Sequence, residues 1–213
     1  WSKLMGEYEA ALLMESGKLN VGLLRLHNVY GPGNAWDPER SQALPSLIRK
    51  AIRYPEEDFT VWGSGDQYRD FLFIDDVIDG LVLIAEKGMN QGVIQIGTGA
   101  PTTLKQAATI VGNLSESLLD KPLKPVFDRT KPEGDRGRIA ITDLAKSVLG
   151  WEAKVGIEEG LRRTFIWVKE DMDRQGAAPA VEELPFISQM SPWFDDAEAN
   201  AVSNYMRSGA YLT

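Results

Sequence analysis

The chain has 213 residues, of which 43% are hydrophobic and 25% charged, a composition typical of a folded globular protein. Its net charge of -8 argues against a nucleic-acid-binding protein, because a surface that contacts phosphates needs an excess of Lys and Arg. With no Cys and one His, the sequence excludes disulfides, a cysteine nucleophile and a thiolate or His-rich metal site. It shows neither a signal peptide nor an apolar run that could span a bilayer, so we expect a cytoplasmic protein.

The first part of the chain predicts a helix, a strand and a turn. Apolar residues recur at helical spacing over residues 2–16, and Gly17 ends the predicted helix. Residues 20–26 are apolar and β-branched, as buried parallel strands are. Residues 27–33 contain Gly and Pro at positions typical of a sharp turn.

The middle of the chain alternates predicted strands with predicted helices. The predicted strands cover residues 59–62, 68–74, 93–96 and 124–127. The predicted helices cover residues 42–53, 75–88, 104–114, 142–150 and 157–168. Asp75 is expected to cap the second helix, and Thr103 with Gln106 forms a capping-box pattern before the third. This alternation predicts an α/β architecture.

The composition changes near Gln175. Residues 175–213 contain five acidic residues and one Arg, and they begin with a Gly-Ala-Ala-Pro-Ala run that is typical of a linker. We therefore expect a main domain at residues 1–172, a linker at residues 173–183 and a terminal segment at residues 184–213.

Two glycine pairs, Gly31-Pro-Gly33 and Gly63-Ser-Gly65, have the spacing of part of a phosphate-binding loop. Neither pair is followed by a third Gly three residues later, and Gly63 leads into a strand. A dinucleotide fingerprint requires a strand, a Gly-rich turn and a helix N-terminus in that order. Both pairs are therefore interpreted as turns.

Five segments, in this order, resemble the extended short-chain dehydrogenase/reductase family of NAD-dependent nucleotide-sugar epimerases and dehydratases. They are Ser2-Lys-Leu-Met-Gly-Glu7, Arg25-Leu-His-Asn-Val-Tyr-Gly-Pro32, Arg69-Asp-Phe-Leu-Phe-Ile-Asp-Asp-Val77, Ile94-Gln-Ile-Gly-Thr-Gly99, and Glu133-Gly-Asp135 followed by Lys146-Ser-Val-Leu-Gly-Trp151. The resemblance covers about residues 1–170. It implies the C-terminal portion of a Rossmann-type domain together with a small α/β substrate-binding domain. The N-terminal nucleotide-binding half is expected to be absent, and the chain alone is expected to be inactive.

The resemblance implies that NAD is the cofactor and that a GDP- or UDP-hexose is the substrate. The expected reaction is epimerisation through a 4-keto intermediate, in an intact parent protein that forms a homodimer. Two alternatives stay open. One is a nucleotide-sugar 4,6-dehydratase, and the other is a fragment that binds sugar nucleotides without catalysis.

Lys3 corresponds to the Lys of the family's Tyr-x-x-x-Lys pair, whose Tyr would stand two positions before Trp1. Residues four apart share one face of a helix, so the ammonium can lower the pKa of the phenol and let it act as a base. Lys3 is thus expected to be catalytic and to bind the nicotinamide ribose. The backbone of Leu26 and His27 is expected to meet the nicotinamide. From the residues alone, Lys3 could be a surface helix residue and His27 a core or turn residue.

Three further positions are expected to bind the substrate. The resemblance implies that Asn28 hydrogen-bonds the substrate, and that Arg69 and Arg138 grip the nucleotide diphosphate. A guanidinium fork suits phosphate oxygens because it donates two parallel hydrogen bonds. Ion pairs with neighbouring acidic residues are the alternative role of both arginines.

Within the family, the sequence resembles the GDP-mannose 3,5-epimerases. Those enzymes have a general-acid Lys in the helix after the Tyr-Gly-Pro turn, and gapless counting from Arg25 places Gln42 there. Gln42 cannot transfer a proton at neutral pH, so this position does not support 3,5-epimerisation. Gln42 and Arg40 are expected to line the sugar pocket, whereas Trp62 is expected to fill the core.

Residues 184–213 resemble the opening of the sugar aminotransferase family that uses pyridoxal phosphate. The similar residues include Leu184-Pro-Phe186, Ser191-Pro-Trp193 and Arg207-Ser-Gly-Ala-Tyr-Leu-Thr213. The resemblance implies a parent in which one part makes a keto sugar and the other aminates it. Such a pairing favours a dehydratase or an oxidising epimerase in the first part.

Overall fold

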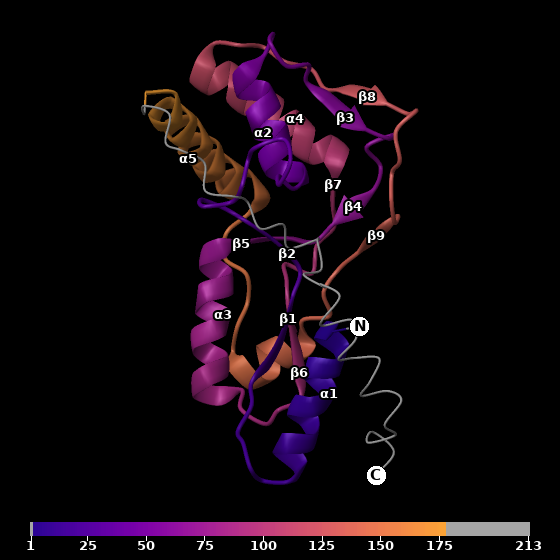
Figure 1. The fold of residues 1–213 in the computed structure, drawn as a ribbon, viewed down its shortest axis with the longest axis vertical. Helices are drawn as coiled ribbons and strands as arrows, with labels where there is room; N and C mark the ends of the chain where they lie inside the picture. The colour runs from indigo at the N-terminus through magenta and orange to yellow at the C-terminus, as the bar shows by residue number, and fades with distance from the viewer. Residues whose placement is uncertain (1, 178–213) are drawn as a thin grey trace, which may run out of the picture. The chain divides into compact units, whose positions relative to one another are not determined.

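A computed structural model of the chain describes residues 2–177, and the predicted terminal segment at 184–213 lies outside them. The chain forms one compact unit up to Gly176. Strands and helices alternate along this unit, which confirms the predicted α/β class (Figure 1). Within residues 2–177, no helix is both long enough and apolar enough to cross a membrane.

The elements lie close to the predicted ranges. The helices are α1 (Ser2–Glu15), α2 (Ala43–Arg53), α3 (Ile74–Lys87), α4 (Leu104–Leu119), α5 (Ile157–Ala177) and the short π-helix η1 (Ala145–Leu149). The strands are β1 (Leu23–Leu26), β2 (Asn28–Tyr30), β3 (Thr60–Trp62), β4 (Tyr68–Arg69), β5 (Phe71–Phe73), β6 (Val93–Ile96), β7 (Thr102–Thr103), β8 (Val126–Asp128) and β9 (Gly137–Arg138).

The strands form four small sheets. Three are parallel pairs, β1 with β6, β2 with β5, and β3 with β8. In the fourth sheet β4 lies in the middle, antiparallel to β7 and parallel to β9. Among the residues that the structure describes, β1 pairs along one edge, with β6, and its other edge has no partner strand.

The larger hydrophobic cluster lies between helices α2, α4 and α5 (Figure 1). On α5, the predicted periodic residues Leu161, Phe165 and Val168 are fully buried in this cluster. The capping box at the start of α4 is confirmed, since Thr103 Oγ1 accepts from the Gln106 N–H and the Gln106 side chain bonds back to the Thr103 N–H. Local sequence signals and packing therefore agree in this region.

The second cluster joins α3, β6 and η1, with Trp151 packed beside them. The prediction that Asp75 caps α3 was wrong, because the capping position is Phe73 and no side chain caps it. Asp75 instead pairs with Arg163. Asp76 is buried and accepts hydrogen bonds from the backbone N–H groups of residues 154 and 155, which ties α3 to the chain before α5.

Helix α1 differs from the others in having no buried residue. Its predicted apolar stripe, Leu4, Tyr8 and Leu12, is 53%, 60% and 47% exposed. The helix is tied to β1 by an ion pair in which the Arg25 guanidinium donates two hydrogen bonds to the Glu7 carboxylate.

Three further boundaries differ from the sequence predictions. Residues 28–30 form strand β2 instead of a turn, because they pair with β5, and the turn starts at Gly31. The predicted strand at residues 68–74 divides at Asp70, since β4 belongs to the three-stranded sheet and β5 pairs with β2. Residues 173–177, the first part of the expected linker, are helical in α5.

Candidate functional site

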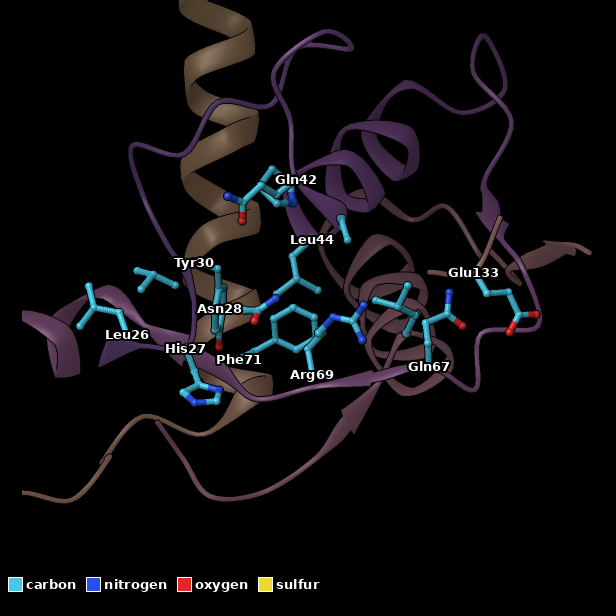
Figure 2. Close-up of a pocket in the computed structure, with 14 residues that line it drawn as sticks. Leu26, His27, Asn28, Tyr30, Gln42, Leu44, Gln67, Arg69, Phe71 and Glu133 are labelled. Carbon is cyan, nitrogen blue, oxygen red and sulfur yellow. The ribbon is translucent and has the colours of Figure 1, made fainter. Parts of the chain in front are cut away.

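The candidate site is a cavity of about 660 Å³ where β1 and β2 meet the start of α2 (Figure 2). Its lining comes from residues 26–30, residues 42–45, Gln67, Arg69, Phe71, Leu104 and Glu133. Parallel strands that end at one edge of a sheet place their following residues together, and such edges commonly bind ligands. The cavity therefore lies where the α/β fold favours a small-molecule site.

His27 and Asn28 lie at the junction between β1 and β2. The backbone N–H of His27 donates to the Ile96 carbonyl of β6, and that of Asn28 donates to the Asp70 carbonyl. Among the described residues, the Asn28 carboxamide has no hydrogen-bond partner, whereas His27 Nε2 lies 3.4 Å from Gln95 Oε1. Asn28 can therefore offer both a donor and an acceptor to a ligand.

Arg69 supplies the positive charge of the cavity wall. Its Nη1 donates to the Tyr68 carbonyl at 2.7 Å and to the Asp135 carbonyl at 3.1 Å. Both acceptors are neutral, so the charge of Arg69 is not balanced by a carboxylate in an ion pair. Arg138 is the register partner of Arg69 on the neighbouring strand and pairs with the Asp135 carboxylate. Arg69 is therefore the member of this pair whose charge is left for an anionic ligand.

The buried carboxylate of Asp70 holds this region together. It accepts four hydrogen bonds, from the backbone N–H and hydroxyl of Thr98 and from the backbone N–H groups of Gly99 and Ala140. These donors come from the chain after β6 and the chain after β9. Asp70 therefore fixes the backbone on which Arg69 and Asn28 are placed, and its own charge is turned away from the ligand space.

A second cavity of about 410 Å³ adjoins the first along α2 and β3. Five residues line both cavities, namely Gln42, Ala43, Gln67, Leu104 and Glu133. Trp62 lines the second cavity and is 56% exposed, so the prediction that it fills the core was wrong. The core position on β3 is taken by Val61, because side chains alternate along a strand.

The turn at residues 63–66 meets the segment that carries Glu133. Gly63 has φ +80°, and a Cβ at this position would lie 2.3 Å from the Glu133 side chain. Only Gly fits such a close approach at a positive φ. Glu133 Oε1 in turn accepts a hydrogen bond from the Ser64 N–H at 2.6 Å. The Gly63-Ser-Gly65 pair is thus a tight turn, as predicted, and it adjoins Trp62 and Glu133 of the second cavity.

A buried guanidinium positions the loop before α2. Arg49 is 4% exposed and donates to the Trp36 carbonyl, the Ser41 hydroxyl and the Glu57 carboxylate. The hydrogen bond from Arg49 holds the pKa of Glu57 below its usual value. Beside it, burial lowers the pKa of the Lys50 ammonium, which donates to the Thr60 carbonyl at the wall of the second cavity.

Tyr30 also lines the first cavity, but it is no candidate for proton transfer. Its hydroxyl is buried without a hydrogen-bond partner among the described residues. Burial, with a smaller contribution from the charge of Asp76, raises the pKa of this hydroxyl far above neutrality. Tyr30 therefore stays protonated and packs against Phe71 and Phe73.

The structure brings five of the eight predicted site residues to the first cavity, namely Leu26, His27, Asn28, Gln42 and Arg69. The other three do not line it. Lys3 is exposed on α1, and Arg40 donates to Asp37 in the loop before α2. Arg138 lies beside Arg69 but is 75% exposed and bonded to Asp135. Within residues 2–177 no three His, Asp or Glu side chains gather as a metal site.

Gln67 and Glu133 are lining residues that the sequence interpretation did not assign to the site. A signal for Gln67 exists, since it directly precedes the predicted strand that carries Arg69. Glu133 was recognised as part of a family motif, but its place beside the Gly63 turn depends on pairing between β3 and β8, which are far apart in sequence.

NAD fits this set of residues in part. Leu26 and His27 line the cavity and could meet a nicotinamide ring, whereas Lys3 is not a lining residue. The sequence contains no strand, Gly-rich turn and helix N-terminus in the order that holds a pyrophosphate. The described residues therefore do not form a complete NAD site.

An α/β unit with a polar, Arg-containing cavity at its strand ends has the features of a small-molecule binding site. Residues 1–97 match the NAD dependent epimerase/dehydratase family. The chain belongs to this NAD-dependent epimerase/dehydratase family, as the five sequence segments predicted.

Named relatives share part of their length with the chain. GDP-mannose 3,5-epimerase of Arabidopsis thaliana is 33% identical over 72% of this chain and 39% of its own length. GDP-L-fucose synthase of Escherichia coli (strain K12) is 30% identical over 69% of this chain and 48% of its own length. The chain thus spans less than half of the length of these two relatives.

Solved structures show the same fold. UDP-glucose 4-epimerase of Thermotoga maritima, determined with UDP-glucose, has a TM-score of 0.71 at 30% identity, over 80% of this chain and 52% of that one. UDP-glucuronic acid 4-epimerase of Bacillus cereus, in complex with UDP-glucuronic acid and NAD, has a TM-score of 0.65 at 26% identity, over 79% and 51% of the two chains. This chain therefore resembles about half of each enzyme.

Proposed function

We propose that the described unit binds the nucleotide-sugar substrate of an NAD-dependent epimerase. The observation that carries the proposal is the meeting of Asn28 and Arg69 in one cavity at the strand ends. Arg69 supplies a cation without a carboxylate partner, and Asn28 supplies an unpartnered carboxamide. A sugar linked to a diphosphate needs this combination, because its phosphates take charged donors and its hydroxyls take neutral hydrogen-bonding groups.

The proposed ligand extends from the first cavity into the second. The hexose lies near Asn28 and Gln42, the diphosphate lies at Arg69 with Arg138 on the adjoining strand, and the base lies in the second cavity beside Trp62. An exposed indole offers a face on which a base can stack. The backbone at Leu26 and His27 is then left to border the reacting end of the sugar.

The proposed reaction of the whole enzyme is epimerisation through a 4-keto sugar, with NAD as the hydride acceptor and donor. In that enzyme, Lys3 belongs to the Tyr–Lys pair, and a nucleotide-binding half completes the NAD site. Packing of that half explains the exposed apolar stripe of α1 and the unpaired edge of β1. The intact enzyme forms a homodimer. A 4,6-dehydratase joined to an aminotransferase is the alternative, and it depends on residues 184–213.

A second candidate function is binding without catalysis. It is favoured by the position of Lys3, which is exposed on α1 and does not line the cavity. Both candidate functions use the same nucleotide-sugar site. They differ in whether the whole protein converts the bound sugar. Under either one, this chain alone binds a nucleotide sugar and does not convert it.

The role of Arg69 can be measured by titration calorimetry of the 213-residue chain with UDP-glucose and with GDP-mannose. At least one of them should bind, and Arg69→Met should weaken that binding about tenfold to hundredfold, because a charge-assisted hydrogen bond to phosphate is lost. Arg162→Met is the matched control, since Arg162 pairs with Glu159 on the surface of α5. Equal binding by the Arg69 variant, or no binding of either compound by the unaltered chain, contradicts the proposal.

A further inference from the structure

Trp36 is tied to two helices that both border the larger hydrophobic cluster, α2 and α5 (Figure 1). Its indole N–H donates to the Asp171 carboxylate of α5 at 2.9 Å, across 135 residues of sequence. Its backbone carbonyl accepts from the buried Arg49 guanidinium of α2 at 2.7 Å. The ring itself packs against the cluster. Both the side chain and the backbone of Trp36 are therefore fixed to the core of the unit.

A hydrogen-bonded turn follows Trp36. The Asp37 carbonyl accepts from the Ser41 N–H at 3.0 Å, and the Asp37 carboxylate accepts from the backbone N–H and the guanidinium of Arg40. The Ser41 hydroxyl also accepts from the Arg49 guanidinium. Because these hydrogen bonds close the turn on itself, we expect it to move as one piece with Trp36.

This turn forms part of the wall of the candidate site. Pro38 and Ser41 line the second cavity, and Gln42, which follows the turn, lines both cavities. A binding wall must be held within about 0.5 Å of its productive position, so a small shift of the turn is enough to weaken binding. Asp171 lines neither cavity, and its link to them passes through Trp36.

The Asp171 carboxylate is itself held in place. Its side chain is 20% exposed, and it also accepts from Arg174 and Gln175, one turn further along α5. A hydrogen bond to a charged acceptor is stronger than one between neutral groups, which makes this carboxylate an effective anchor for the indole. We propose that Asp171 is a positioning residue for the nucleotide-sugar site, which holds the turn in its binding arrangement through Trp36. The inference rests on the proposed function.

Without the Asp171 hydrogen bond, the turn should occupy its binding arrangement for only part of the time. The apparent affinity of a ligand falls in proportion to the fraction of molecules that are in the competent arrangement. A residue that acts through another in this way changes affinity by a modest factor, about three- to tenfold, and leaves the contacts with the ligand themselves intact.

Titration calorimetry of the 213-residue chain with UDP-glucose and with GDP-mannose measures the effect. For each nucleotide sugar that the unaltered chain binds, Asp171→Ala should weaken binding about three- to tenfold. Asp171→Asn keeps an oxygen that accepts from the indole N–H, so its affinity should stay within about twofold of the unaltered chain. Asp173→Ala is the matched control and should bind as the unaltered chain does, because Asp173 lies on the same helix and pairs with Lys169 at the surface.

A double-mutant cycle assigns the effect to the contact with Trp36. Trp36→Phe keeps an aromatic ring and removes the N–H donor, so it should weaken binding about as much as Asp171→Ala. The variant with both substitutions should bind no more weakly than the weaker of the two single variants, because both remove the same hydrogen bond. The stoichiometry of each titration reports the folded fraction, so a loss of folded protein does not mimic a change in affinity.

Three results would overturn the positioning role. They are an unchanged affinity in Asp171→Ala, an equal loss in Asp171→Asn or Asp173→Ala, and losses that add in the variant with both substitutions. In each of them the unaltered chain still binds a nucleotide sugar, and the proposed function stands. If the unaltered chain binds neither UDP-glucose nor GDP-mannose, the proposed function is wrong, and the role of Asp171 with it.

Discussion

Helices α1 and α3 have the same length, 14 residues, but they are stabilised in different ways. On α3, Val77 and Ile84 are buried in the second hydrophobic cluster. On α1, no residue is buried, and the apolar stripe faces outward. The difference shows that an apolar pattern of helical period forms a core only where another element covers it.

The same contrast separates the binding region from α1. The cavity wall is built on the ends of β1 and β2, on α2, on β4 and β5, and on the start of α4. Apart from β1, these elements contribute to the larger cluster or adjoin the Asp70 hydrogen bonds. Helix α1 carries Lys3 but shares no residue with the cavity lining. The proposed substrate binding and the proposed catalytic role of Lys3 are therefore expected to depend on different parts of the structure.

The largest expected effect is a fall in the free energy of unfolding when the packing of α3 is disrupted. Ile84 is 6% exposed and lies against Gly22 and Gly88, where an added Cβ would come within 2.9 and 2.6 Å of its side chain. Ile84→Ala should lower the free energy of unfolding by about 2–4 kcal/mol, because it leaves a cavity in a closely packed site. Leu12→Ala on α1 is the matched control and should cost under about 0.5 kcal/mol. Urea unfolding measures the free energy of unfolding of both variants. Equal losses in the two variants would contradict the contrast, because they would show that α1 is packed as closely as α3.

A smaller effect concerns two ion pairs, one buried and one exposed. The hydrogen bond from buried Arg49 keeps the pKa of Glu57 below its ordinary value in the folded chain. A carboxylate with a lowered folded pKa stabilises the fold above its unfolded pKa, and this contribution disappears as the pH falls through the folded pKa. Glu57→Gln should therefore be less stable than the unaltered chain at pH 7, and the gap should close toward pH 3.

Glu7→Gln on α1 provides the comparison for Glu57. Its partner Arg25 is about half exposed, and solvent and salt screen such a pair. Urea unfolding at pH 7 in 0.15 M salt should show little change for Glu7→Gln and a measurable loss for Glu57→Gln. If the difference in free energy of unfolding between the unaltered chain and Glu57→Gln stayed constant from pH 7 to pH 3, the assigned role of the Arg49–Glu57 pair would be contradicted.

Sequence periodicity predicted α5 and its buried residues because one face of a long amphipathic helix repeats regularly. The capping box before α4 was predictable for a similar reason, since its hydrogen bonds join residues three apart. The outward position of Trp62 and the end of β2 at Tyr30 depend on strand pairs between distant segments, β3 with β8 and β2 with β5. Such pairing is not encoded in any local window.

The residues of the candidate site also fall into two groups, those that local sequence predicts and those that depend on the folded structure. Asn28 and Arg69 were predictable from motifs that follow or form strands, and the structure places both in the cavity. Gln67 and Glu133 become lining residues through tertiary contacts with the Trp62 carbonyl and the Ser64 N–H. Those contacts form only in the folded chain, because the turn that contains Gly63 and Gly65 brings the donors and acceptors together.

The central claim is that residues 2–177 bind a nucleotide sugar by themselves. Calorimetric titration of the 213-residue chain with UDP-glucose and with GDP-mannose, each in the absence and presence of NAD, tests it directly, with product formation followed in the same samples. We expect one of the two nucleotide sugars to bind with the same affinity with and without NAD, and we expect no product to form. Binding that requires NAD, or turnover that depends on NAD, would contradict it.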